Sequence, residues 1–210
     1  EPSADWVEMK VYIPKEIPEK HKRISDIISR KYNLHTRKLT DKKEILRSGV
    51  AHDIFRLIND AYEPLFNFSR MTEKQYVNMY LPVLDLRMVS IVENEQGEIV
   101  AVGISMPSLS EALQKAKGKL LPLGWFHLLK ALKWKRPKVL DLLLVGVRPD
   151  YQGKGVNALL FTELIPVYQQ LGFEYAETNP ELEMNEKVQN QWQYFKTEQH
   201  KRRRCFKGDI

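Results

Sequence analysis

The chain has 210 residues, of which 43% are hydrophobic, so it is long enough for one well-buried domain and too short for two large ones. Lys and Arg outnumber Asp and Glu by 33 to 27, which gives a net charge of +6 and suits an anionic ligand or surface. The only cysteine is Cys205, so no intrachain disulfide can form, and no stretch approaches the roughly 18 apolar residues of a membrane span. No signal peptide is recognised, and we expect a cytoplasmic protein.

The N-terminal segment is interpreted separately from the rest. Residues 6–13 alternate well enough for a strand, and the prolines that follow indicate a linker. Because the numbering starts at Glu1 rather than at a methionine, we expect a longer translated chain. Residues 1–32 are then an N-terminal strand and linker that could end a preceding module, and residues 33–210 form the main domain.

Helices and strands follow one another in a mixed order. The spacing of apolar residues indicates the helices, and the turn ending in Gly97 predicts a hairpin. Up to the hairpin we expect a helix at 24–32, a strand at 34–39, a helix starting near Thr40, helices at 54–62 and 71–81, and strands at 87–93 and 98–106.

Residues 108–136 are expected to be helical and basic. Their apolar residues fall on one side of the helix, and lysines occupy the remainder. Such a pattern could lie on a membrane surface, but an ordinary surface helix with a solvated cationic face is favoured. The apolar side comprises Leu121, Trp125, Leu128, Leu129 and Leu132.

The segment 139–147 is almost continuously apolar, as expected for a strand buried on both faces at the centre of a sheet. It leads into a glycine-containing loop and then a helix from about 155 to 170. A strand at 173–178, a helix at about 181–195 and a final strand at 202–206 complete the chain.

Three templates for phosphate-binding loops compete for this loop. A Walker loop fails because Gly155, not Ser or Thr, follows Lys154. The dinucleotide pattern GxGxxA is met by Gly153, Gly155 and Ala158, but five residues separate the first glycine from the strand. A plain turn between strand and helix is a further alternative.

A third phosphate-binding template, different from the two above and from a plain turn, fits best. The run V-x-P-x-Y-Q-G-K-G at 147–155 resembles the signature of the GCN5-related N-acetyltransferase (GNAT) superfamily, in which Q/R-x-x-G-x-G/A cradles the coenzyme A pyrophosphate. Gln152 and Gly155 match it, whereas Asn157 stands where the family prefers Gly or Ala. The order of elements from residue 34 is also that of the family, and the segments KGKLLPLG and ELEMN resemble long bacterial GNAT-like proteins.

The resemblance implies a mixed α/β fold, a splayed central sheet flanked by helices, and acetyl-CoA as co-substrate. Backbone groups of Val145 and Val147 would pair with the pantetheine arm, which Asn185 would also face. The loop residues implied in binding the pyrophosphate are Gln152, Gly153, Lys154, Gly155, Val156 and Asn157. Backbone N–H groups at a helix N-terminus suit such an anion.

The implied reaction needs a general base for the amine. Glu177, Glu181 and Glu183 cluster where the expected strand at 173–178 meets the expected helix at 181–195. Glu177 is the first choice, with Glu183 as a further candidate. On that helix the family often has a tyrosine that protonates the leaving thiolate, but Trp192 occupies its place.

We therefore expect an acyl-CoA-dependent N-acyltransferase that acts on an unidentified amine, either a small molecule or a peptide, without a metal. The alternative is a catalytically degenerate GNAT-like module that binds coenzyme A. Neither a nucleic acid nor a membrane is favoured as partner. For a nucleic acid, the reason is that the charges of residues 200–204 would alternate between two faces of a strand and need not form one patch. A homodimer remains open.

Overall fold

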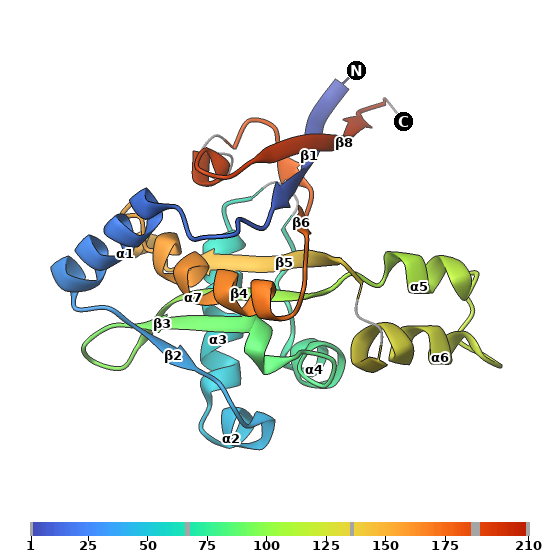
Figure 1. The fold of residues 1–210 in the computed structure, drawn as a ribbon, viewed down its shortest axis with the longest axis horizontal. Helices are drawn as coiled ribbons and strands as arrows, with labels where there is room; N and C mark the ends of the chain where they lie inside the picture. Colours follow the sequence, from blue (N-terminus) through green and yellow to red (C-terminus); the bar gives the residue numbers. More distant parts are fainter. Residues whose placement is uncertain (1, 66–67, 135–136, 186–189, 209–210) are drawn as a thin grey trace.

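The computed structural model describes residues 2–65, 68–134, 137–185 and 190–208. These residues form an open mixed sheet of eight strands in the order β2-β3-β4-β5-β6-β1-β7, with β8 paired to β1 (Figure 1). The mixed α/β fold expected from the sequence is confirmed. The strands are β1 Pro2–Tyr12, β2 His35–Lys38, β3 Val89–Glu93, β4 Ile99–Pro107, β5 Val139–Val147, β6 Tyr175–Thr178, β7 Glu181–Leu182 and β8 Thr197–Phe206.

Two helices cover opposite faces of the sheet, α7 in front and α3 behind in Figure 1. Added Cβ atoms on two glycines mark the close approach: that of Gly103 would lie 3.2 Å from Leu164 of α7, and that of Gly146 would lie 2.9 Å from Leu57 of α3. The helices are α1 Glu19–Tyr32, α2 Lys42–Arg47, α3 Val50–Tyr62, α4 Glu73–Gln75, α5 Ser110–Lys115, α6 Gly124–Leu129 and α7 Asn157–Gln170. Short helical turns are η1 Tyr76–Tyr80, η2 Leu86–Met88, η3 Lys130–Trp134, η4 Pro149–Tyr151 and η5 Asn190–Trp192.

The sheet opens between β5 and β6. These strands are parallel and pair only from Val139 to Leu142, opposite Tyr175 to Thr178. Beyond Leu142, β5 continues for five residues, of which 144–147 pair with β4, and these five have no strand on the other side within the described part of the chain. We call this open wedge the seam.

The N-terminal strand is part of the same sheet. One edge of β1 pairs with β6 at residues 10–12 and with β7 at residues 6–7, and β8 runs along the other edge. The division of the chain at residue 32 stays a prediction.

Two helical predictions are wrong. The expected helix at 108–136 is interrupted, because Lys117 and Gly118 adopt positive φ angles and Pro122 follows them, which leaves the short helices α5 and α6 and the turn η3. The expected helix at 181–195 is absent from its described residues. Glu181 and Leu182 instead pair with β1, whose edge offers them backbone hydrogen bonds, and Asn190–Trp192 form a 3₁₀ turn.

Candidate active site

The open edge of β5 in the seam is occupied by polar side chains rather than by a strand. The Tyr62 hydroxyl, from the end of α3, donates to the carbonyl of Val145 at 3.2 Å and accepts from its N–H at 3.3 Å. The carbonyl of Leu143 accepts from the Asn179 amide, and that of Val147 accepts from Gln152 Nε2 at 3.1 Å. The backbone groups that the sequence assigned to pantetheine therefore lie on an accessible edge held by exchangeable partners.

The glycine loop continues from this edge into helix α7. Gly153 and Gly155 have φ angles of 74° and 80°, which glycine adopts readily. Within the described residues, the N–H groups of Gly153, Gly155, Val156 and Asn157 donate to no backbone carbonyl. Unpaired N–H donors at the start of a 14-residue helix are of the kind that can bind an anion.

Positive charge lies beside these donors. The Lys154 ammonium is 5.1 Å from the ring centre of Tyr32 and 5.0 Å from that of Tyr151, so two aromatic faces hold it at the rim of the loop. Arg148 is neutralised by Asp150 at 2.8 Å and Glu98 at 3.0 Å. Lys154 is therefore the better placed cation for an incoming phosphate.

The Asn157 side chain is bound to a residue outside the glycine loop. Its amide donates to Gln191 Oε1 at 3.4 Å, across to the η5 turn. The residue that departs from the family pattern thus has a partner inside the protein.

Glu181 is a carboxyl group with a strongly raised pKa. Burial raises the pKa of Glu181 from its ordinary value of 4.5 to about 7, although hydrogen bonds from Trp192 and Thr178 oppose the shift. Trp192 Nε1 donates to Glu181 Oε1 at 3.1 Å. Burial also raises the pKa of the Tyr62 hydroxyl, and the charge of Glu181 raises it further. The two groups therefore interact electrostatically.

The two carboxylates preferred from the sequence lie elsewhere and are engaged in ion pairs. Glu177 Oε2 is 3.2 Å from Lys201 Nζ, and Glu183 Oε2 is 2.8 Å from Arg202. Glu177 is paired across the sheet with Asp141 and Lys10, on the face opposite to its buried neighbour Ala176. Of these three glutamates, Glu181 is partly buried and lies two residues after Asn179, whose amide binds the open edge of β5.

The helical stripe expected to carry Asn185 is absent from the residues of that segment that the structure describes. The N–H of Asn185 donates to the Leu182 carbonyl at 2.8 Å in a turn, and the side chain is partly buried. Trp192 is 5% exposed and packs against Phe161 of α7. Val188, a further member of the stripe, lies outside the described residues.

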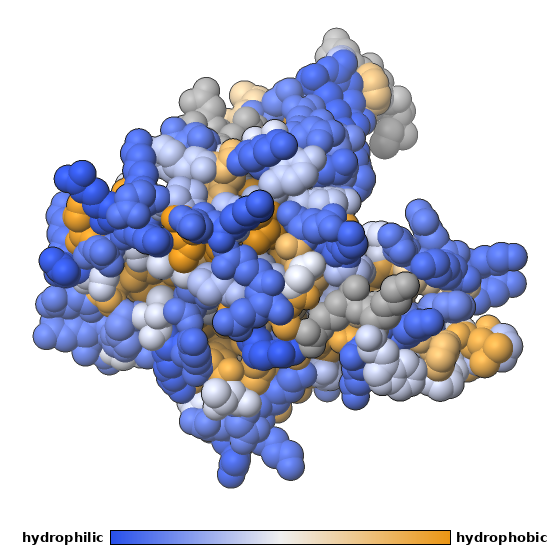
Figure 2. All heavy atoms as spheres, viewed as in Figure 1, coloured by the Kyte–Doolittle hydropathy of each residue, from blue (hydrophilic) through white to orange (hydrophobic). Residues whose placement is uncertain are grey.

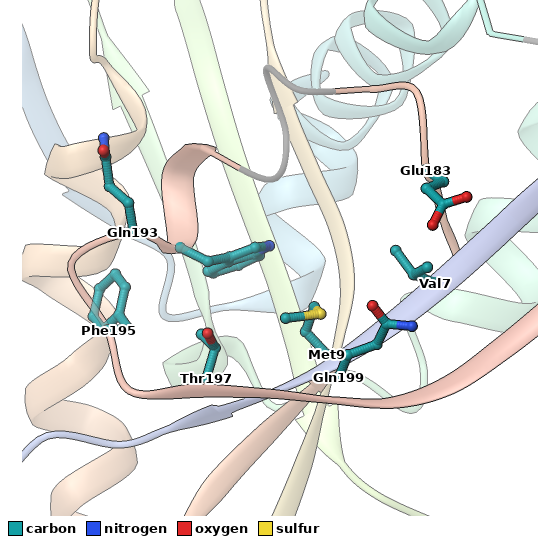
Figure 3. Close-up of a pocket in the computed structure, with 8 residues that line it drawn as sticks. Val7, Met9, Glu183, Gln193, Phe195, Thr197 and Gln199 are labelled. Atoms are coloured by element: carbon teal, nitrogen blue, oxygen red, sulfur yellow. The ribbon is translucent and has the colours of Figure 1, made fainter.

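A pocket of about 270 Å³ opens beside Trp192, between β1, β8 and the residues at the end of η5 and just after it, with Glu183 also in its lining (Figure 3). Its lining is mixed: β1 and the η5 region contribute apolar side chains, and β8 contributes polar ones. In Figure 3 the Met9 side chain reaches into it. The lining residues are Val7, Met9, Glu183, Trp192, Gln193, Phe195, Thr197 and Gln199.

One cluster brings together groups of metal-ligand type, namely Glu8, Glu177 and His200, with one atom of each within 4.8 Å of the others. Lys201 already bridges Glu8 at 2.9 Å and Glu177 at 3.2 Å, and Arg203 lies 2.6 Å from Glu8. Because these cations already balance both carboxylates, the cluster behaves as an ion-pair network.

Sequence reasoning missed Tyr62 and Asn179 as residues of the seam. Tyr62 was assigned to the apolar face of a helix, and its hydroxyl was not considered. A buried tyrosine hydroxyl usually finds a partner, so its place at the end of an apolar face was the available signal. Asn179 directly follows a strand and precedes a proline, where a polar side chain is often free to bind backbone.

Comparison with known proteins identifies the fold. No family model matches the chain. The crystal structure of a GCN5-related N-acetyltransferase from Sphaerobacter thermophilus superposes with a TM-score of 0.58 at 13% identity, over 96% of this chain and 50% of that one. The chain therefore has the GNAT fold, as the sequence resemblance implied.

Two curated proteins are related in sequence. "Bacterial ceramide synthase" of Caulobacter vibrioides (strain NA1000 / CB15N) is 36% identical over 99 residues, which are 46% of this chain and 26% of that protein. "Protein YghO" of Escherichia coli (strain K12) is 24% identical over 201 residues, which are 90% of this chain and 49% of that protein. The match thus spans less than half the length of either curated relative. Among the described residues, no helix has both the length and the apolar character needed to cross a membrane.

Proposed function

We propose that the protein is an acyl-CoA-dependent N-acyltransferase, with acetyl-CoA as the simplest donor and an amine as acceptor. The observation that carries the proposal is the continuity of the β5 edge at Val145 and Val147 with the unpaired N–H donors of the glycine loop. A flexible chain with amide groups can pair with the first, and a pyrophosphate suits the second. The GNAT fold and a relative named as a ceramide synthase, which is an N-acylating enzyme by name, support the same chemistry.

In this proposal Val145 exchanges its hydrogen bonds to Tyr62 for bonds to a pantetheine amide. The released Tyr62 hydroxyl is then free to protonate the thiolate as the C–S bond breaks. Its pKa, raised by burial, keeps it protonated at neutral pH. Tyr62 would thus take the part that Trp192 cannot perform.

Glu181 is the proposed general base, in place of Glu177 and Glu183. An amine is mostly ammonium at neutral pH and must lose a proton before its nitrogen attacks the thioester carbonyl. A partly buried carboxylate whose pKa is about 7 accepts a proton there more readily than an ordinary one. Trp192 holds the carboxylate in place through its indole N–H.

The acceptor is proposed to be an amine with an apolar portion. The pocket beside Trp192 presents Val7, Met9 and Phe195 together with polar side chains, which suits an amphiphilic molecule. A panel should therefore contain long-chain amino alcohols besides polyamines, amino sugars and peptide amines.

The first experiment is calorimetric titration with acetyl-CoA, a long-chain acyl-CoA and NAD. We expect a coenzyme A thioester to bind with micromolar affinity, which is a binding free energy of about 8 kcal/mol, and we expect NAD not to bind. Binding of NAD alone would instead favour the dinucleotide interpretation of the loop.

Turnover is then measured as release of coenzyme A thiol with the amine panel. Because Cys205 is exposed and reacts with thiol reagents, the assay uses the Cys205→Ser background. Thiol release that depends on the amine supports the enzyme. Tight coenzyme binding without release by any amine would favour the alternative, a binding module that has lost catalysis.

Three matched variants then assign the base. Glu181→Gln should lower kcat by about 100-fold without changing acyl-CoA affinity, whereas Glu177→Gln should leave kcat nearly unchanged. Glu183 lines the proposed acceptor pocket, so Glu183→Gln should change the KM for the amine rather than kcat. A loss confined to Glu177→Gln would restore the choice made from the sequence. Tyr62→Phe should lower kcat while acyl-CoA binds as tightly as before or more tightly, since a competitor for Val145 has been removed.

A further inference from the structure

A helical arm projects from the end of the sheet where β4 ends and β5 begins. It consists of α5, α6, η3 and their connections, residues 108–138, and we call it the arm. Its helices pack mainly on one another, and Figure 1 shows them extending beyond the strands. The glycine loop lies at the other end of β5.

The arm leaves its apolar side chains in solvent. Half of the fourteen large hydrophobic residues that are exposed in the described chain belong to it. A surface helix of ordinary type would bury such residues against the core. They are Leu113, Leu120, Leu121, Leu123, Trp125, Phe126 and Trp134, with exposures from 41% to 77%.

These residues form a patch with internal order. The ring centres of Phe126 and Trp134 are 5.7 Å apart, and those of Trp125 and Phe126 are 6.1 Å apart. The Trp125 indole N–H donates to the Pro122 carbonyl at 3.0 Å. In Figure 2 orange spheres gather on the projecting arm beside blue ones. Contiguous exposed patches of this kind usually mark an interaction site.

The arm also carries the positive charge of the protein. Residues 108–138 contain eight Lys and Arg and a single Glu, a net charge of +7, whereas the whole chain carries +6. Lys115 pairs with Glu111 and Lys138 with Glu174. Within the described residues, Lys117, Lys119, Lys130 and Lys133 are exposed and form no ion pair, so they can meet an anionic partner.

We propose that the arm docks on the surface of an anionic lipid bilayer. Leucines enter the acyl boundary, tryptophans suit the interface, and lysines reach the phosphate groups. A second copy of this chain is disfavoured as occupant because it would bring another arm with the same charge of +7. The proposal is independent of acyl transfer, since it uses none of the seam or loop residues.

The test is co-sedimentation of the whole protein with vesicles. The probes are phosphatidylcholine alone and an equimolar mixture of phosphatidylcholine and phosphatidylglycerol. We expect binding to the anionic vesicles only, weakened by salt, and a blue shift of tryptophan fluorescence as Trp125 and Trp134 leave water. Failure to bind anionic vesicles at low salt would overturn the proposal.

Two variants separate a docked arm from general stickiness. The triple replacement Leu120→Ser, Leu121→Ser, Leu123→Ser should reduce vesicle affinity by about tenfold or more with an unchanged circular dichroism spectrum. The control replaces exposed apolar residues elsewhere, Met79→Ser with Met184→Ser, and should bind like the original protein. Equal losses in both would refute the assignment to the arm.

A charge variant and a mass measurement complete the test. Lys117→Glu with Lys119→Glu should abolish the preference for anionic vesicles, and a retained preference would contradict the role of charge. If the unaltered protein were a dimer that the triple leucine variant converts to a monomer, the arm would be a contact between copies and the membrane proposal would be wrong.

Discussion

The two halves of the sheet on either side of the seam are stabilised in different ways. Strands β2 to β5 lie between α3 and α7, and this half buries aliphatic residues completely, among them Ile58 of α3 and Ile91, Val100 and Val102 of the strands, all at 0% exposure. The half built from β6, β1 and β8 is bound to a large extent by ion pairs, because β8 carries alternating and consecutive charges. A packed half of this kind can hold a loop rigidly, whereas the charged half should respond to pH and salt.

The largest stability effect is expected in the apolar half. Leu160 of α7 is 1% exposed and packs against the sheet at Gly103, so Leu160→Ala should lower the free energy of unfolding by about 2–5 kcal/mol in urea titrations. The matched control Leu121→Ala, at a site 77% exposed on the arm, should stay within about 0.5 kcal/mol. Equal losses at both sites would break the distinction between buried and exposed apolar segments.

The next effect lies at the seam itself and depends on pH. The pKa of Glu181 is raised to about 7 in the folded protein, so the folded state holds its proton more tightly than the unfolded one. Stability should therefore fall as pH rises from about 4.5 to about 7, and Glu181→Gln should remove this fall. At pH 8 the variant should be more stable than the original by on the order of 2 kcal/mol, measured by urea unfolding at pH 5 and pH 8. If the variant were less stable than the original at pH 8, the ionised Glu181 carboxylate would not be destabilising the folded state at that pH.

A smaller effect is expected for the buried carboxylate of the charged half. Glu8 is 5% exposed and lies 2.9 Å from Lys201 and 2.6 Å from Arg203. Since both partners are partly solvated, Glu8→Gln should cost only about 1–2 kcal/mol, with the larger cost at low salt. Glu198→Gln, at an exposed pair with Lys10, is the control and should change stability by less than about 0.5 kcal/mol.

The smallest effect is expected at Asp5. Hydrogen bonds from Arg204 and Arg202 hold the pKa of Asp5 well below its usual range. Its stabilising contribution is therefore present above the unfolded pKa near 4 and is lost as pH falls through the lower folded value. Asp5→Asn should slightly lower the thermal midpoint at pH 7, and the difference should shrink in acid and in high salt. A difference that grows in acid would contradict the ion pair.

The sequence predicted the apolar half well because local patterns decide it. The hairpin of β3 and β4, the continuous apolar strand β5 and the helix α7 each have a period or a turn that stands out within a few residues. The glycine loop was found in the same way. The order of the elements around it, read from the same local patterns, matches the GNAT fold.

The charged half and the seam were harder to predict because distant residues decide them. Glu181 and Leu182 have helical spacing with Trp192, but the edge of β1, about 175 residues earlier, binds them as a strand. Which glutamate is perturbed depends on burial and on ion pairs with β8, and spacing alone cannot show either. The resemblance supplied a tyrosine position on an expected helix whose described residues are not helical in that way, since they form β7 and a 3₁₀ turn. The hydroxyl in the seam comes instead from Tyr62 of α3.

The side chains that occupy the open edge of β5 have a further consequence. An exposed strand edge with unpaired backbone groups is a template onto which a strand of another molecule can add, and this leads to aggregation. Tyr62, Asn179 and Gln152 each satisfy the edge through a single polar group. A foreign strand would have to displace all three and also fit between β5 and β6. The wedge can thus stay open without inviting self-association of the sheet.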